Sequence, residues 1–113
     1  MKKTYLIIKI LIIYFSFITG GLTIETDYLS KAIQLYEIKK FDEAKIMFEK
    51  ELVFNPKSEN AYLYLAKIFN KDEFENEQEI NLNNVLIINP INDEALYMLT
   101  ILKIKQSDYN QAK

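Results

Sequence analysis

Apolar side chains recur every three or four residues along most of the chain after about residue 25. In the first such stretch, Tyr28, Leu29, Ala32, Leu35 and Tyr36 form one stripe of an amphipathic helix. The same spacing predicts helices over residues 26–39, 42–54, 59–71, 76–88 and 93–106, with a sixth beginning near Tyr109. The sequence therefore predicts an all-α protein with short connections.

Two Asn-Pro pairs, Asn55-Pro56 and Asn89-Pro90, are offset by 34 in the numbering, and each ends an apolar helical run. A second pattern agrees, because Phe41-Asp42-Glu43-Ala44 recurs as Tyr109-Asn110-Gln111-Ala112 at an offset of 68, twice the same period. Proline cannot continue a helix and disfavours helical backbone in the residue before it. Each predicted pair of helices therefore ends at the same position of the repeat. A period in this range is typical of stacked helix-turn-helix units.

These residues resemble the tetratricopeptide repeat (TPR) family, whose units are helix pairs of about 34 residues. The resemblance covers residues 25–113 and implies a short all-α solenoid of about two and a half repeats, with units at 25–58, 59–92 and 93–113, the last incomplete. The residues that carry it are Tyr28, Ala32, Phe41, Asp42, Glu43, Ala44, Phe48 and Pro56 in the first unit, Tyr62, Leu65, Ala66, Phe69, Leu82, Val85, Leu86 and Pro90 in the second, and Leu96, Leu99, Thr100, Tyr109 and Ala112 in the third.

The second unit departs from the family pattern at its turn. Phe74 falls one place before the position that corresponds to Phe41, and Gln78 replaces the small residue found at Ala44. We therefore expect a looser or locally altered turn between the two helices of this unit.

In the family, the first helix of each pair lines a concave groove that takes extended or helical peptides, so the resemblance implies a protein or peptide partner. By register, the groove-facing candidates are Leu29, Ile33, Tyr36, Leu63, Lys67, Asn70, Lys71, Tyr97, Ile101 and Ile104. Four of these residues have an alternative interpretation as core positions shared by adjacent helices: Leu29, Ile33, Leu63 and Ile101. Lys67, Asn70 and Lys71 form a polar, partly basic cluster, which fits either an acidic peptide or a solvated helix end. Capture of a C-terminal carboxylate is disfavoured, because Leu29 and Ile33 stand where the family uses lysine and asparagine.

Composition excludes most catalytic chemistry. The chain has no cysteine, histidine, tryptophan or arginine, so it lacks a thiolate nucleophile, an imidazole base and a guanidinium clamp. The two glycines, Gly20 and Gly21, both lie in the N-terminal apolar segment, residues 1–21, which we call the leader. The rest of the chain therefore has no phosphate-binding glycine loop. Paired carboxylates are the one enzyme class that composition permits, and nothing places two of them across a cleft. We expect no enzyme activity and no cofactor.

The charge balance argues against nucleic acid as a ligand. The chain has 14 lysines and 16 acidic residues, and Lys2, Lys3 and Lys9 precede every acidic residue. The remaining 11 lysines against 16 carboxylates give a net charge of −5, which repels phosphate. An acidic run, Glu73, Glu75, Glu77 and Glu79, is expected to be a solvated loop and not a cation site, because Ca²⁺ loops need a glycine at the sharp bend.

Residues 1–21 are typical of a secretory signal peptide. Lys2 and Lys3 supply the positive start, residues 10–18 form an apolar run, and Thr19-Gly20-Gly21 supplies small residues for cleavage after Gly21. A membrane-spanning helix needs about 20 apolar residues, more than this run provides, so cleavage is preferred to anchoring. The alternatives are an uncleaved anchor over residues 5–24 in the cytoplasmic membrane and a buried first helix. Both the signal and the anchor imply export to the periplasm, the cell envelope or the exterior.

The sequence therefore predicts an exported protein-binding module over residues 22–113, an adaptor or scaffold that holds its partner in the groove. The alternative is a structural fragment of a larger or truncated TPR protein that acts through self-association or membrane-anchored assembly. The third unit stops a few residues into its second helix, so Leu96, Leu99 and Leu102 are expected to lack a covering helix. Such an apolar face favours self-association through the C-terminal helix.

Overall fold

A computed structural model describes residue 3 and residues 27–112 of the chain. The described part is all-α: it contains α2 (Tyr28–Glu37), α3 (Phe41–Phe54), α4 (Glu59–Lys71), α5 (Glu75–Ile88) and α6 (Asp93–Gln111), and no strand. The signal-peptide and anchor predictions lie outside these residues. In the part of the chain that is described, no helix is both long and apolar enough to cross a membrane.

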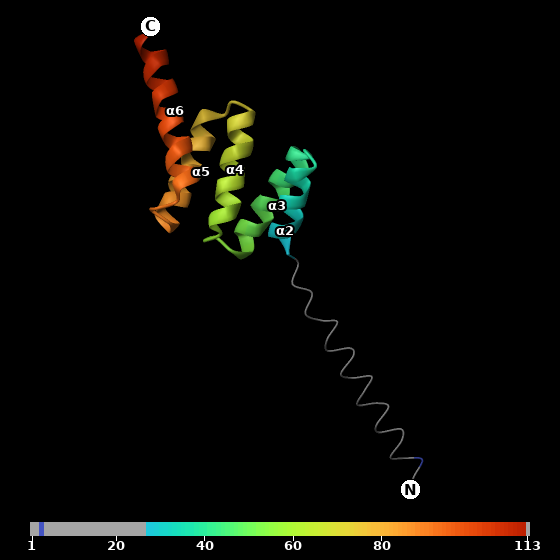
Figure 1. The fold of residues 1–113 in the computed structure, drawn as a ribbon. Helices are drawn as coiled ribbons and strands as arrows, with labels where there is room; N and C mark the ends of the chain where they lie inside the picture. Colours follow the sequence, from blue (N-terminus) through green and yellow to red (C-terminus); the bar gives the residue numbers. More distant parts are fainter. Residues whose placement is uncertain (1–2, 4–26, 113) are drawn as a thin grey trace.

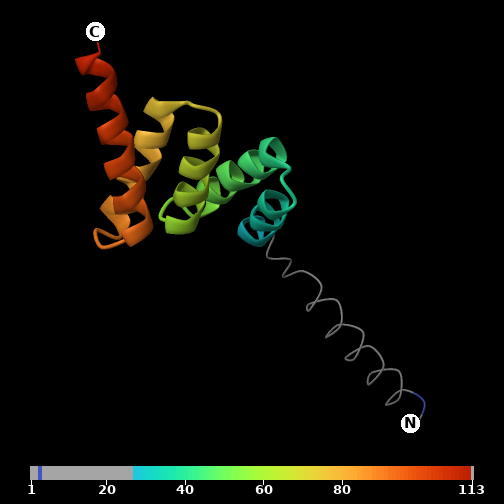
Figure 2. The same ribbon diagram turned by 45° about the horizontal axis from the view of Figure 1, so that its top comes forward.

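The helices form two antiparallel pairs, α2 with α3 and α4 with α5, followed by the single helix α6 (Figures 1 and 2). Successive elements pack on one another, and α2 also contacts α4. This is a short helix-turn-helix solenoid of two pairs and one further helix. In both views α6 extends past the turn that joins α4 to α5.

Two core clusters fill the stack, and α4 contributes to both of them. The first lies between α2, α3 and α4 around Phe48, and the second lies between α4, α5 and α6 around Leu82. Phe48 and Leu82 occupy the same position of successive repeats and are both fully buried. Small residues follow the same period, because Ala32, Ala66, Ala61 and Ala95 are all fully buried. These alanines let neighbouring helices approach closely while the larger side chains fill the space around them.

The turns inside the two pairs have the same backbone geometry. Lys39 and Glu73, which are equivalent positions of the two units, have positive φ angles of 64° and 62°. In each turn the amide after this residue donates to a carbonyl in the last helical turn, Lys40 N–H to Leu35 O and Phe74 N–H to Phe69 O, both 2.9 Å. This pattern is the Schellman motif, which closes a helix C-terminus by satisfying its unpaired carbonyls. The altered turn expected in the second unit is therefore wrong: Gln78 and the shifted Phe74 leave the backbone unchanged.

The Asn-Pro junctions also repeat. Asn55 and Asn89 are extended, with φ of −132° and −136°, as expected for residues that precede proline. Three residues later, Ser58 and Asn92 cap the following helices, where their side-chain oxygens accept the amide hydrogens of Ala61 and Ala95. The chain thus leaves each second helix and enters the next first helix along the same path.

A sixth helix near Tyr109 is not formed, because α6 runs unbroken from Asp93 to Gln111. The period places Ser107 where Lys39 and Glu73 adopt positive φ, and Ser107 is helical instead. A left-handed residue other than glycine costs about 1–2 kcal/mol, and in the first two turns the packing of the second helix offsets that cost. In the third unit no second helix packs in the described residues, so helix continuation is favoured.

Candidate interaction surface

Nine of the ten candidate groove residues, all but Lys71, fall into three rows with a spacing of 34: Leu29, Leu63 and Tyr97; Ile33, Lys67 and Ile101; Tyr36, Asn70 and Ile104. The structure places members of one row in different environments. Leu29, Ile33 and Tyr36 are half-buried and pack against the first core cluster. Their apolar surface is largely used by the fold and is only partly available to a partner.

The α4 members are also engaged within the protein. Leu63 is only 6% exposed and belongs to the second core cluster. The ammonium group of Lys67 lies 2.6 Å from a carboxylate oxygen of Glu94 and 4.8 Å from the centre of the Tyr64 ring. Lys71 Nζ lies 4.2 Å from the centre of the Phe41 ring, and Asn70 is exposed. Lys67 therefore ties α4 to α6 as well as contributing to the polar cluster.

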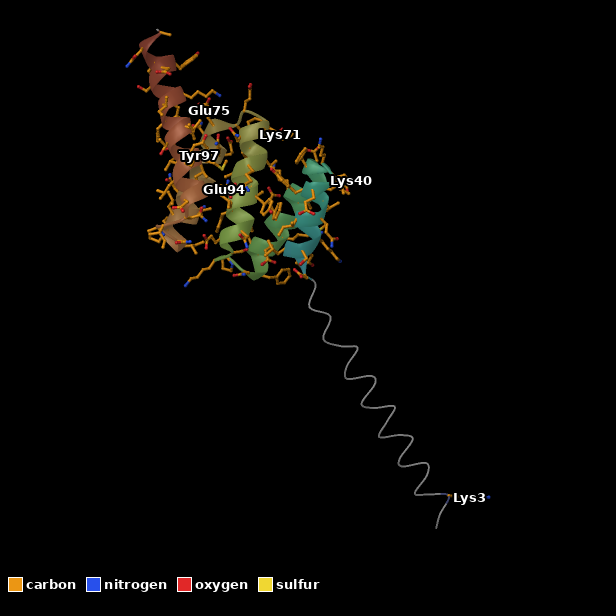
Figure 3. All side chains as sticks on the ribbon, in the orientation of Figure 1. Lys3, Lys40, Lys71, Glu75, Glu94 and Tyr97 are labelled. Carbon is orange, nitrogen blue, oxygen red and sulfur yellow. The ribbon has the colours of Figure 1, made fainter. Side chains whose placement is uncertain are left out.

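Exposed apolar side chains gather on α6. Tyr97, Ile101 and Ile104 are 68%, 49% and 53% exposed, and their spacing of four and three residues puts them on one stripe, which we call the α6 apolar row. Glu94 precedes Tyr97 by one helical turn, and its ion pair with Lys67 shows that the start of this stripe borders α4 (Figure 3). The row is thus a continuous apolar strip beside the first helix of the preceding pair.

The opposite face of α6 is covered. Leu102 is 3% exposed, Ala95 is fully buried, and Met98 and Leu99 pack against the second core cluster. The expectation that Leu99 and Leu102 lack a partner is therefore wrong, because α5 and α4 cover them; Leu96 alone of the three named leucines remains exposed, at 43%. Thr100, Lys103 and Ser107, on the outer side, are polar and exposed. The exposed apolar side chains of α6 include Tyr97, Ile101 and Ile104, which the repeat register gave as groove-facing candidates.

The acidic run is not a loop. Glu75, Glu77 and Glu79 lie in α5, and only Glu73 lies in the turn. Glu75 pairs with Lys105 at 2.9 Å and Glu79 pairs with Lys103, so two of these carboxylates hold α5 to the distal half of α6. Hydrogen bonds from Lys105 and Lys103 lower the pKa values of Glu75 and Glu79, and the partnership with Glu75 raises the pKa of Lys105. These pairs add exposed contacts to the packing of α5 against α6.

Two residues of this surface were not predicted as part of it. The Tyr64 ring stacks on Phe48, with ring centres 5.0 Å apart, and meets the Tyr36 ring edge to face at 4.9 Å. Glu94 was missed as the partner of Lys67. The sequence contained a signal for Glu94, because Glu94 lies in the first turn of α6, three residues before Tyr97 and on the same stripe. Tyr64 is off the groove register, and its role becomes visible only when α2, α3 and α4 are packed together.

Depressions on the surface lie away from most predicted groove residues. One, of about 660 Å³, lies between the start of α5 and the end of α6 and is lined by Glu75, Lys105, Gln106, Asp108, Tyr109 and Asn110. Another, of about 440 Å³, borders the α6 apolar row at Ile104 and is lined also by Leu99, Thr100, Lys103 and Ser107. No group of three or more acidic residues in the described part is arranged to hold a metal ion.

Comparison of the chain with protein-family models, with curated proteins and with solved structures gives no significant match. The interaction surface is therefore interpreted from its own residues.

Proposed function

We propose that this chain is an exported protein-binding module that holds a peptide or protein segment against the α6 apolar row. The observation that carries the proposal is the exposure of Tyr97, Ile101 and Ile104 on one stripe of a helix whose opposite face packs against the second core cluster. Contiguous exposed apolar side chains on an ordered helix are typical of interaction sites. Aromatic residues such as Tyr97 are enriched among the residues that dominate binding energy.

Neighbouring charges support a protein partner. The Lys67–Glu94 ion pair flanks the row and leaves its charged groups at the edge of the apolar strip, with Glu94 about half exposed. A polar rim around an apolar centre is the usual anatomy of a protein interface. The resemblance to TPR proteins gives the same class of function, and the leader favours export.

A pull-down with charged variants tests the proposal. Tyr97→Glu and Ile101→Glu place a carboxylate inside the apolar row, and we expect each to weaken capture of the native partner by about tenfold or more. Ile46→Glu and Ile80→Glu are matched controls, because these residues are 50% and 59% exposed on α3 and α5, away from the row. Circular dichroism should show wild-type helicity for all four.

Full capture by Tyr97→Glu and Ile101→Glu would contradict the proposal. Equal loss in the Ile46→Glu and Ile80→Glu controls would show that binding does not depend on this row. If capture were replaced by concentration-dependent dimerisation that Tyr97→Glu abolishes, the row would serve self-association, the structural alternative.

A further inference from the structure

Exposed apolar side chains concentrate at one end of the helix stack. Among the large apolar side chains of the described residues, the four most exposed are Val53, Phe54, Ile87 and Ile91, at 76%, 73%, 78% and 80%. All four lie in or beside the two Asn-Pro junctions, residues 53–58 and 87–92, which we call the junction end. Val53 and Ile87 are related by the repeat period, so the same position is apolar and exposed in both units.

Contacts at this end join each junction to a neighbouring helix, and one depression includes residues of both junctions. The Tyr28 ring stacks on Phe54, with ring centres 5.5 Å apart. Pro56 and Lys57 share a depression of about 410 Å³ with Ile87 and Ile88. The Glu59 carboxylate accepts hydrogen bonds from Asn89 at 2.8 Å and Asn92 at 2.6 Å, which joins the start of α4 to the second junction. The exposed side chains therefore lie on an ordered part of the protein, and the shared depression links the two junctions.

The leader joins the bundle at this same end. The chain enters α2 at Tyr28, whose ring contacts Phe54, and Asp27 caps that helix. If residues 5–24 stay in the membrane, only residues 25 and 26 separate them from Asp27. A fully extended chain from residue 24 to Asp27 spans at most about 11 Å. The start of α2, where Tyr28 contacts Phe54, then lies within that distance of the bilayer.

Charge at the junction end indicates which lipid contact to expect. The Asp27 carboxylate accepts hydrogen bonds from Ser30, and the Glu59 carboxylate accepts hydrogen bonds from Asn92 and Asn89. These hydrogen bonds stabilise the charged form and lower the pKa of each carboxyl group. Lys57 is the single lysine of the two junctions, so the surface lacks the lysine-rich character that attracts anionic lipids. Its exposed valine, phenylalanine and isoleucines fit the apolar side of a neutral headgroup layer.

We propose that the junction end docks on the bilayer that holds the leader, with Val53, Phe54, Ile87 and Ile91 inserted among the headgroups. The proposal rests on the export part of the proposed function and takes the uncleaved-anchor alternative, in which residues 5–24 stay in the membrane. It does not depend on the α6 apolar row. Interfacial segments enter the bilayer by about 5–10 Å. The 14 residues of α5 span about 21 Å, so the opposite end of the stack stays in water.

Site-specific fluorescence on the full chain in phosphatidylcholine vesicles tests this arrangement. The chain has no cysteine, so single cysteines at Val53, Ile87 or Ile91 can carry an environment-sensitive probe without background labelling. We expect blue-shifted emission that spin-labelled lipid quenches and aqueous iodide does not. Ile38 and Phe74, exposed by 63% and 54% beside the opposite turns, are the matched control positions and should remain accessible to iodide.

A second variant separates docking from tethering. Val53→Asp combined with Ile87→Asp should reduce lipid quenching of a probe at Ile91→Cys by about tenfold or more, while a probe at Phe15→Cys in the leader stays quenched. Iodide quenching at the junction end equal to that at Ile38→Cys would overturn the proposal. A Phe15→Cys probe that stays in water would also overturn it. Protection from iodide without lipid quenching, together with a doubled particle mass, would overturn it as well, because a second copy would then cover this end. None of these results depends on capture through Tyr97, so the two proposals fail separately.

Discussion

Glu59 shows how a single polar side chain joins distant parts of one repeat unit. Its carboxylate accepts hydrogen bonds from Asn89 and Asn92, residues 30 and 33 positions later in the chain. Lys67 forms a second link of this kind with Glu94. The Glu59 contacts join the start of the second unit to its end, and Lys67–Glu94 joins the second unit to the third. Each contact joins side chains that are adjacent only after folding.

Glu59 should make stability depend on pH below neutrality. Hydrogen bonds from Asn92 and Asn89 stabilise the carboxylate and lower the pKa of Glu59 in the folded chain, below its ordinary value of 4.5. This contribution is fully present above the unfolded-state pKa and is lost as pH falls through the lower, folded-state pKa. Glu59→Gln should therefore melt at a lower temperature than wild type at pH 7, and the two melting curves should converge as the pH approaches 3. A melting difference that is unchanged across this range would contradict the assignment.

Residue environments could be predicted from sequence only in part. The register grouped Leu29, Leu63 and Tyr97 as equivalent positions, but it could not rank their exposure. Leu63 is buried because the second core cluster forms beside it, whereas nothing covers Tyr97 among the described residues. Burial depends on which helix lies opposite, and a periodic pattern does not contain that information.

At the scale of elements, the apolar spacing and the Asn-Pro pairs predicted the helices well except near residue 109. Pro56 and Pro90 fix the ends of α3 and α5, and α4 matches its predicted range of 59–71. The repeat motif at Tyr109 suggested a turn that does not form, because a turn at Ser107 needs a left-handed residue and a packed second helix to offset its cost. A local motif indicates where a turn is permitted, and tertiary packing decides whether it forms.

Glycine substitutions at one repeat position should have opposite effects in different units. Glu73 has a φ of 62°, so Glu73→Gly relieves left-handed backbone and should raise the free energy of unfolding by about 1 kcal/mol. Lys39→Gly should act in the same direction. Ser107 lies inside α6, so Ser107→Gly should instead lower stability by about 0.5–1 kcal/mol.

Urea titrations followed by circular dichroism measure these differences. If Ser107→Gly stabilised the protein as Glu73→Gly does, the turn inferred from the repeat motif would be present and the unbroken α6 would be wrong.

The whole molecule combines an apolar leader with a helix stack that displays two separate apolar surfaces. The α6 apolar row lies along the outermost helix, and the junction end lies where the leader joins the stack. The two proposals involve different side chains of the molecule. The sequence predicted the all-α solenoid, whereas the groove register stays a prediction. The junction end became visible only in the folded arrangement of residues 53–58 and 87–92.

The leader predicts export, and intact mass spectrometry of protein from the native cell envelope tests this. We expect either a chain that begins near Leu22, after cleavage at Gly21, or the full chain held in the membrane fraction. Full-length protein with Met1 in a soluble cytosolic pool would contradict both forms of export.

Photo-crosslinking at Tyr97 in living cells tests the central claim most directly. A photoreactive phenylalanine analogue replaces Tyr97, which is 68% exposed, and in a control strain it replaces Ile46, which is 50% exposed on α3. The proposed function predicts one dominant adduct with another protein from position 97, absent from position 46 and lost when Ile101→Glu is added. Adducts of equal yield from both positions, or adducts only between copies of this chain, would contradict a partner-binding surface on α6.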